Sequence, residues 1–194
     1  MKKLILASLL VVFMLVYGCT SSIINFDQGI KKINEFDKEY NSTIRSPPSD
    51  SAKIGPLKSD LEGYKSKNRL SEPLIGLIDF KIAFLDAEKL NAKGWQWGRA
   101  STTQYGFGCK GYDNIKESAR LRNASAEQGY LAVDKLEQFV KKFPEESKKT
   151  DLTQKDALVL NAMYFQIQQQ AKKDAGTIEF FCGKKGNETK EAAS

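Results

Sequence analysis

The sequence has no histidine among its 194 residues and only three cysteines. Histidine is the commonest general base and the commonest metal ligand in proteins, so its absence excludes histidine-dependent triads, histidine zinc sites and haem bound through histidine. We find no other catalytic motif in the chain. We therefore expect a protein that is not an enzyme, with no catalytic residues, no metal site and no cofactor.

The chain also has little excess of charge of one sign, with 30 lysine and arginine residues against 24 acidic ones. This excess is dispersed along the sequence, and we therefore predict no nucleic-acid partner. Hydrophobic residues make up 41% and charged residues 28% of the chain, which excludes a disordered tail and a multi-spanning membrane protein. The length indicates one domain with extensions.

The longest apolar run lies at the N-terminus, where residues 4–17 follow Lys2 and Lys3 and are interrupted only by Ser8. As a helix this run would span about 21 Å, which is short of the roughly 30 Å hydrocarbon core of a bilayer. We therefore interpret residues 1–18 as a signal peptide. The two lysines hold the N-terminus on the cytoplasmic side, so the remainder of the chain is expected outside the cytoplasm.

The run ends in Leu15-Val16-Tyr17-Gly18-Cys19, with an apolar residue three positions before the cysteine and a small residue immediately before it. This pattern resembles the lipobox of prokaryotic lipoprotein precursors. The resemblance implies that Cys19 is acylated and becomes the mature N-terminus, which would anchor the domain to the membrane of the cell envelope. Two or more acyl chains give stable attachment, whereas a single chain is marginal. The alternative is an uncleaved N-terminal anchor in which Cys19 is an ordinary thiol.

Apolar residues recur at helical spacing through the rest of the chain, and no segment of useful length alternates with the period of a strand. We predict an all-α protein with about five helices, arranged as an antiparallel bundle or as a stack of helix pairs. The expected parts are an N-terminal helix with a proline- and serine-rich linker (19–53), an α-helical domain (54–182) and a polar tail (183–194). Within the domain, helices are expected at 54–64, 74–90, 114–143 and 153–182, and Gly94 is expected to end the second of them.

The segment from Tyr130 to Pro144 resembles the second helix of a tetratricopeptide repeat. Ala132 takes the small packing position, Leu136 and Val140 take apolar positions, and Pro144 takes the terminal one. The signature of the first helix is missing, and no second copy follows at the period of that repeat. The resemblance implies antiparallel stacking of helix pairs and a scaffold that binds proteins or peptides.

With Cys19 acylated, two thiols remain in the mature chain, those of Cys109 and Cys182. Outside the cytoplasm, a pair of thiols is more often oxidised than free. The helices predicted at 114–143 and 153–182 have equal length and a short connection, so they should pack antiparallel. Cys109 then lies just before the start of one helix, beside Cys182 at the end of the other. We predict a disulfide between them.

The segment 94–112 holds five glycines, five aromatic residues and both tryptophans of the chain, and we expect it to be a long loop. Loops of this length in a compact domain are often functional. Aromatic rings beside cations suit carbohydrates or a partner protein. The residues that we expect to contact a ligand or partner are Trp95, Trp97, Arg99, Tyr105 and Phe107. The alternative is a structural plug, in which the tryptophans fill the open end of the bundle.

These observations favour a lipid-anchored, extracytoplasmic α-helical module for binding or scaffolding, whose ligand the sequence does not name. Its expected partners are the membrane, through the lipid anchor, and an envelope protein or glycan. One alternative is an enzyme that acts on envelope glycans through the carboxylates of Asp79, Asp86 or Glu88. Another is a structural envelope protein without a ligand.

Overall fold

The computed structural model describes residues 22–105 and 109–183, so the signal segment, Cys19, Phe107 and the residues after 183 lie outside the described part. Within that part every regular element is helical, and only two isolated β-bridges occur, which confirms the all-α prediction. The helices are α2 (Phe26–Tyr40), α3 (Ile54–Lys67), α4 (Glu72–Tyr105), α5 (Tyr112–Lys142), α6 (Pro144–Lys149) and α7 (Gln154–Ile178). Short 3-10 turns lie at Ser51–Lys53 and Cys109–Gly111, and a π-helical turn, η3, lies at Glu179–Gly183.

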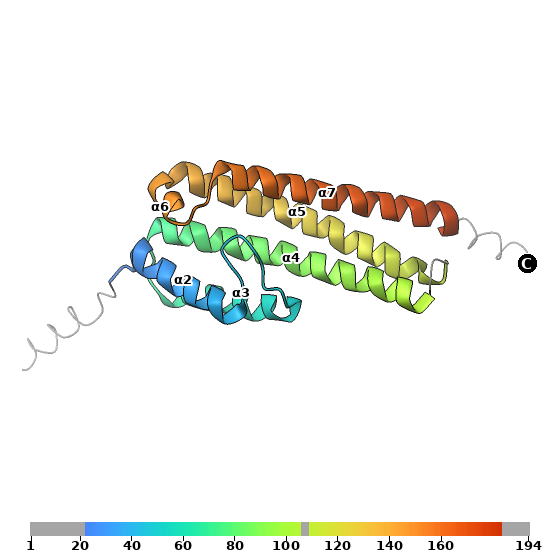
Figure 1. The fold of residues 1–194 in the computed structure, drawn as a ribbon, viewed down its shortest axis with the longest axis horizontal. Helices are drawn as coiled ribbons and strands as arrows, with labels where there is room; N and C mark the ends of the chain where they lie inside the picture. Colours follow the sequence, from blue (N-terminus) through green and yellow to red (C-terminus); the bar gives the residue numbers. More distant parts are fainter. Residues whose placement is uncertain (1–21, 106–108, 184–194) are drawn as a thin grey trace, which may run out of the picture.

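Three long helices determine the shape of the molecule (Figure 1). Helix α5 packs antiparallel against α4 on one side and against α7 on the other, whereas the backbones of α4 and α7 come close to each other at few points. Helices α2 and α3 are short and cover only one half of α4. In the described residues, no helix combines the length and the apolar character that crossing a bilayer requires.

We call the end that carries α2, α3 and α6 the proximal half, with residues 72–91, 126–142 and 154–164 of the long helices. The chain enters the bundle here, since the Ile24 amide donates to the Arg69 carbonyl at 2.8 Å and Lys149 pairs with Asp27 at 2.6 Å. The fully buried side chains of this half include Ile33, Leu57, Leu61, Leu74, Leu77, Phe80, Leu85, Leu136 and Tyr164. All members of the large apolar core belong to the proximal half.

We call the other end the distal half, with residues 92–105 of α4, 109–125 and 165–183. Its helices meet through small residues, because a Cβ added at Gly94 would lie 2.6 Å from Cγ of Arg122 and 3.1 Å from the Ser118 carbonyl oxygen. Gly98 faces Ser118 in the same way. Buried Ser101 donates to the Gly111 carbonyl at 3.1 Å. We call this contact between α4 and α5, made by Gly94, Gly98 and Ser118, the seam. The backbones are so close here that larger side chains are excluded.

This seam explains why the predicted loop at 94–112 is wrong. Helix α4 continues through Gly94 and Gly98 to Tyr105, and α5 already begins at Tyr112. Both glycines lie inside the helix, where they allow close packing, and neither ends it. Glycine has a low helix propensity, and the contacts of the seam offset this loss of stability. The helix expected at 54–64 is α3, which continues to Lys67 and tolerates Pro56 because this residue lies in the first turn.

The two C-terminal helices agree with the prediction closely. Helix α5 ends at Lys142 and α7 begins at Gln154, and the connection between them contains the short helix α6. The carboxylate of Asp156 accepts the Thr153 amide at 2.8 Å, which forms a capping box at the start of α7. Cys109 and Cys182 form the predicted disulfide, with Cα atoms 5.4 Å apart and a sequence separation of 73.

Candidate functional site

Both tryptophans are half-exposed on α4, at 50% for Trp95 and 44% for Trp97. They therefore do not fill the end of the bundle, and the plug interpretation is wrong. Trp95 and Arg99 are one helical turn apart and share a face of α4, whereas Trp97 points to another side of the helix. The side chain of Tyr105 and all of Phe107 lie outside the described residues.

A groove of about 540 Å³ lies in the distal half, where α4 and α7 both pack on α5 without closing on each other. Trp95 of α4 forms one wall, and Arg122 of α5 contributes to the lining between the two outer helices. The other wall belongs to α7 and consists of Phe165, Gln166, Ile167, Gln169, Gln170 and Lys173. A volume of this size is in the range of small-molecule binding sites.

Arg122 is the charged centre of this groove, and it is only 4% exposed. Its guanidinium lies 5.1 Å from the ring centroid of Trp95, on one face of the indole. One terminal nitrogen donates to the carboxylate of Asp174, which also accepts from the Gln170 amide at 2.7 Å. The buried Nε–H of Arg122 has no hydrogen-bond partner within the described residues. A buried donor without a partner is costly, at about 1–3 kcal/mol.

Arg122, Phe165 and Asp174 are not among the contact residues expected from the sequence. Arg122 had a signal, since it is a charged residue on the otherwise apolar face of the helix predicted at 114–143. No feature of the sequence indicated Phe165 or Asp174, because their approach to Trp95 and Arg122 depends on how α7 packs along α5.

The three candidate carboxylates do not converge on one cleft. Asp79 pairs with Lys65 at 2.5 Å and Asp86 pairs with Lys58 at 2.6 Å, so both are used to hold α3 on α4. Glu88 faces α7 and accepts from the Tyr164 hydroxyl at 3.0 Å. The enzyme alternative requires free carboxylates that share an open cleft, and this arrangement does not provide them.

Burial changes the acidity of the Glu88 and Tyr164 pair. Desolvation raises the pKa of Glu88 above its ordinary value, although hydrogen bonds from Tyr164 and Asn91 act in the opposite direction. The pKa of Tyr164 is raised by its burial and by the adjacent Glu88. The pair therefore tends to keep its protons, and it acts as a buried polar bridge between α4 and α7.

A second buried pair lies in the proximal half and was not expected from the sequence. Lys81 is 1% exposed and donates to the carboxylate of Asp37 and to the Thr43 carbonyl at 2.9 Å. Burial lowers the pKa of Lys81, against the opposing effect of Asp37. The pair fixes the turn after α2 onto α4. A lysine inside the apolar run of the predicted helix 74–90 was its signal in the sequence.

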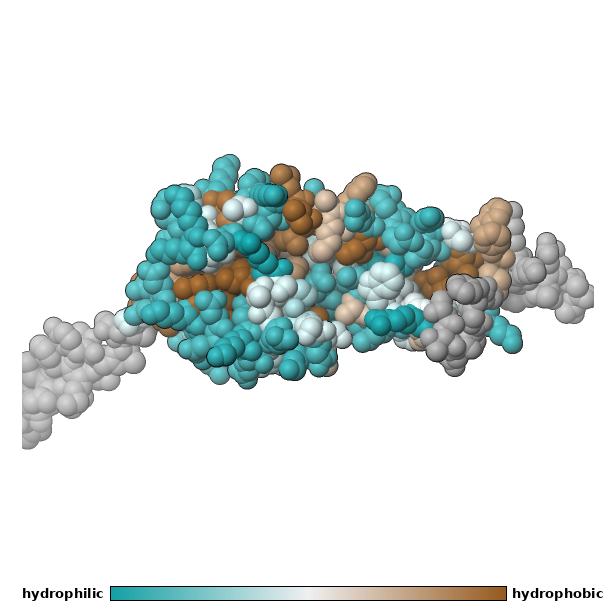
Figure 2. Space-filling model, viewed as in Figure 1, coloured by the Kyte–Doolittle hydropathy of each residue, from teal (hydrophilic) through white to brown (hydrophobic). Residues whose placement is uncertain are grey.

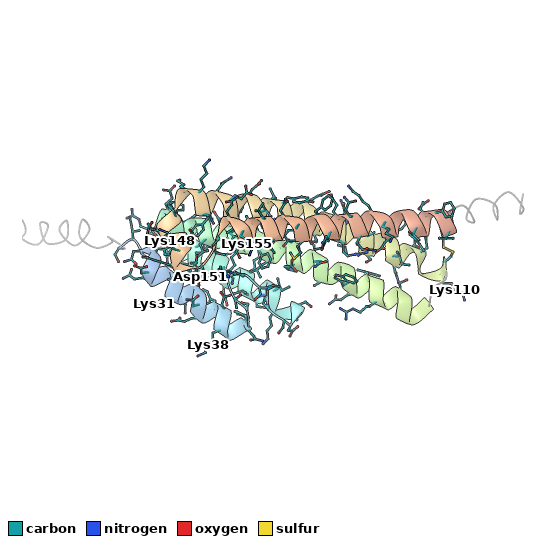
Figure 3. The ribbon with its side chains drawn as sticks, turned by 45° about the horizontal axis from the view of Figure 1, so that its top comes forward. Lys31, Lys38, Lys110, Lys148, Asp151 and Lys155 are labelled. Carbon is teal, nitrogen blue, oxygen red and sulfur yellow. A yellow bond between two sulfur atoms is a disulfide. The ribbon has the colours of Figure 1, made fainter. Side chains whose placement is uncertain are left out.

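The turn after α2 also borders a hollow of about 390 Å³ that reaches Thr150 and Asp151. Figure 3 shows Asp151 at this proximal end together with Lys31, Lys38, Lys148 and Lys155, and it shows Lys110 at the opposite end of the bundle. Lys148 pairs with Glu145 at 2.8 Å and Lys149 pairs with Asp27 at 2.6 Å, so the charge of this end is mixed.

No protein-family model, curated protein sequence or solved structure matches this chain.

Proposed function

We propose that this protein is a lipid-anchored binding module of the cell envelope and that its distal half contacts the partner. The lipobox resemblance at Cys19 supplies the anchor, and the chain enters the fold at the proximal end a few residues later. The lipid would therefore hold the proximal half at the membrane. Helix α5 has 31 residues, so the distal end would lie about 46 Å away along the helix axis.

The observation that carries this proposal is the distribution of aromatic side chains. The large aromatic residues that are exposed in the described part of the chain are Trp95, Trp97, Phe165, Phe180 and Phe181, and all of them belong to the distal half. Figure 2 shows apolar residues that interrupt the hydrophilic surface along α7 and towards both ends of the bundle. Aromatic residues that gather on one part of a surface are typical of contact sites for other molecules.

The π-helical turn η3 extends this surface to the tip of the bundle. Phe180 and Phe181 are 71% and 67% exposed, and their rings meet edge to face with centroids 5.1 Å apart. The disulfide of Cys182 holds this turn beside the start of α5. Rigid aromatic residues lose little conformational entropy on binding, which makes them efficient contact residues.

A photo-crosslinking experiment tests this proposal in cells that process lipoproteins. The full chain would carry a photoreactive phenylalanine analogue at Phe180 in one strain and at Leu158 in the other. Leu158 is a matched control, because it is 60% exposed and lies in the proximal half of α7. We expect adducts with envelope material from position 180 only, and we expect Trp95→Ala with Trp97→Ala to reduce them. Equal adducts from both positions, or none from position 180, would contradict the proposal.

The anchor is tested separately by fractionation of the same cells. We expect Cys19→Ser to move the protein from the membrane fraction to the soluble extracytoplasmic fraction, because the acylated thiol is lost. Retention of this variant in the membrane would favour the alternative of an uncleaved N-terminal anchor.

A further inference from the structure

We propose that the groove between α4 and α7 binds a saccharide that carries a carboxylate. This inference rests on the proposed function, because the groove belongs to the distal half that is proposed to contact a partner. It goes further by naming the ligand class and the residues that select it.

The walls of the groove suit a ring with one apolar face. One face of the Trp95 indole is covered by Arg122, yet half of the Trp95 surface remains exposed beside the groove. Phe165 is exposed on the opposite wall. A pyranose ring presents a face of C–H groups that packs against an aromatic plane, and its hydroxyls project from its edge.

The polar lining argues against an apolar helix as the occupant. Gln166, Gln169 and Gln170 contribute three amides to the α7 wall, and each amide has donors and acceptors. An apolar helix would cover these amides and Arg122 without giving them hydrogen bonds, and an unpaired buried polar group is costly. The hydroxyls of a saccharide are both donors and acceptors, so they match the amides.

The charges of the groove favour a negative group on that saccharide. Arg122 and Lys173 are positive, and Asp174, which pairs with Arg122, is the nearby carboxylate. Asp174 takes one donor of the guanidinium and leaves Nε–H without a partner. A carboxylate from a ligand could accept two hydrogen bonds from Arg122, and Asp174 occupies one of those two positions. We therefore expect the carboxylate of the ligand to compete with Asp174 for Arg122.

The test uses the full chain solubilised in detergent, with Trp97→Phe so that Trp95 is the only tryptophan. Its fluorescence then reports directly on the groove. The probes are N-acetylmuramic acid and N-acetylglucosamine, which share the sugar ring and differ in the lactyl carboxylate. We expect saturable changes with both sugars and about tenfold tighter binding of the acidic one, which is the effect of one charge-assisted hydrogen bond.

Three variants separate selection by charge from structural damage. Lys173→Gln should weaken binding of the acidic sugar and leave the neutral sugar unchanged, whereas Lys172→Gln, which removes the same charge outside the groove lining, should change neither. Asp174→Asn should strengthen binding of the acidic sugar several-fold, because it removes the internal competitor. A residue with only a structural role would not produce this gain.

Equal affinities for the two sugars, or no response to either, would overturn the inference. Binding of an acidic peptide in place of the sugars would overturn it as well. If the crosslinks from position 180 persist while the titration fails, only the ligand class is wrong. If the crosslinks from position 180 are also absent, both the ligand class and the proposed function are wrong.

Discussion

The two halves of this bundle are stabilised in different ways, although the same three helices run through both. In the proximal half, α2 and α3 complete a core of large aliphatic and aromatic side chains, with Ile33, Leu57 and Leu85 fully buried. In the distal half, α4 and α5 meet through Gly94, Gly98 and Ser118, and a disulfide closes the end. Large buried side chains contribute about 1.5–3 kcal/mol each, a source of stability that the distal seam does not have.

The difference between the halves explains where the aromatic residues lie. A seam of small residues brings two helix backbones together and leaves no interior space for an indole ring. Trp95 and Trp97 are therefore directed outward, and Phe165 faces a groove that no fourth helix fills. The proximal half uses its aromatic residues for packing, for instance Phe26 against Phe139 with ring centroids 6.2 Å apart. In the distal half, the close packing of small residues and the exposure of aromatic side chains therefore have the same cause.

The largest effect on this comparison is expected from Lys81→Met in the proximal half. The change leaves the Asp37 carboxylate buried without its cation, which should lower the free energy of unfolding by about 3–5 kcal/mol. Urea denaturation followed by far-UV dichroism measures the loss. Lys81→Met combined with Asp37→Leu should recover most of it, because no unpaired charge then remains. A loss below 1 kcal/mol in the single variant would mean that the pair is not buried as described.

Removal of the disulfide is expected to act mainly on the distal half. Cys109→Ser with Cys182→Ser should lower the free energy of unfolding by about 2–4 kcal/mol, since the unfolded chain gains freedom. Hydrogen exchange followed by mass spectrometry should show faster exchange near residues 96–105 and 170–183, with α2 and α3 unchanged. Equally faster exchange in α2 and α3 would show that the two halves open as one unit.

Two glycine substitutions probe the seam itself. Gly94→Ala places a methyl group against Arg122 and the Ser118 backbone and should destabilise the protein by about 1–3 kcal/mol. Gly176→Ala, in α7, has no atom within 4 Å of the added Cβ and should stabilise the protein by about 1 kcal/mol. Thermal unfolding of both variants measures the contrast. Stabilisation by both changes would contradict the close seam.

The smallest effect is expected at Glu88, where the halves join. Its raised pKa means that its contribution to stability is complete below the ordinary pKa of a glutamate and is lost as pH rises through the raised value. Glu88→Gln keeps a polar partner for Tyr164 and removes the ionisation. We expect it to raise the free energy of unfolding at pH 8 by about 1 kcal/mol and to have no such effect at pH 4. Thermal melts at the two pH values decide this, and an equal effect at both would contradict it.

The sequence predicted the fold class and the helices α5 and α7 well, because apolar residues at helical spacing indicate a buried face directly. The disulfide was predictable for a related reason, since two antiparallel helices with a short connection place the start of the first beside the end of the second. The groove was not predictable beyond Trp95. Gly94 carries no local sign that distinguishes a helix stop from a packing position, and the choice depends on Arg122 and Ser118 of another helix.

The amino-acid sequence by itself determined that the chain is helical, that α5 and α7 run antiparallel and that Cys109 and Cys182 meet, because spacing and length are local properties of the chain. Only the tertiary structure decided that Asp79 and Asp86 are held by α3 and that Trp95 faces Arg122 and Phe165 across a groove. The reason is that burial and pairing of a side chain depend on helices that are distant in the sequence, and their approach is set by packing along the whole bundle.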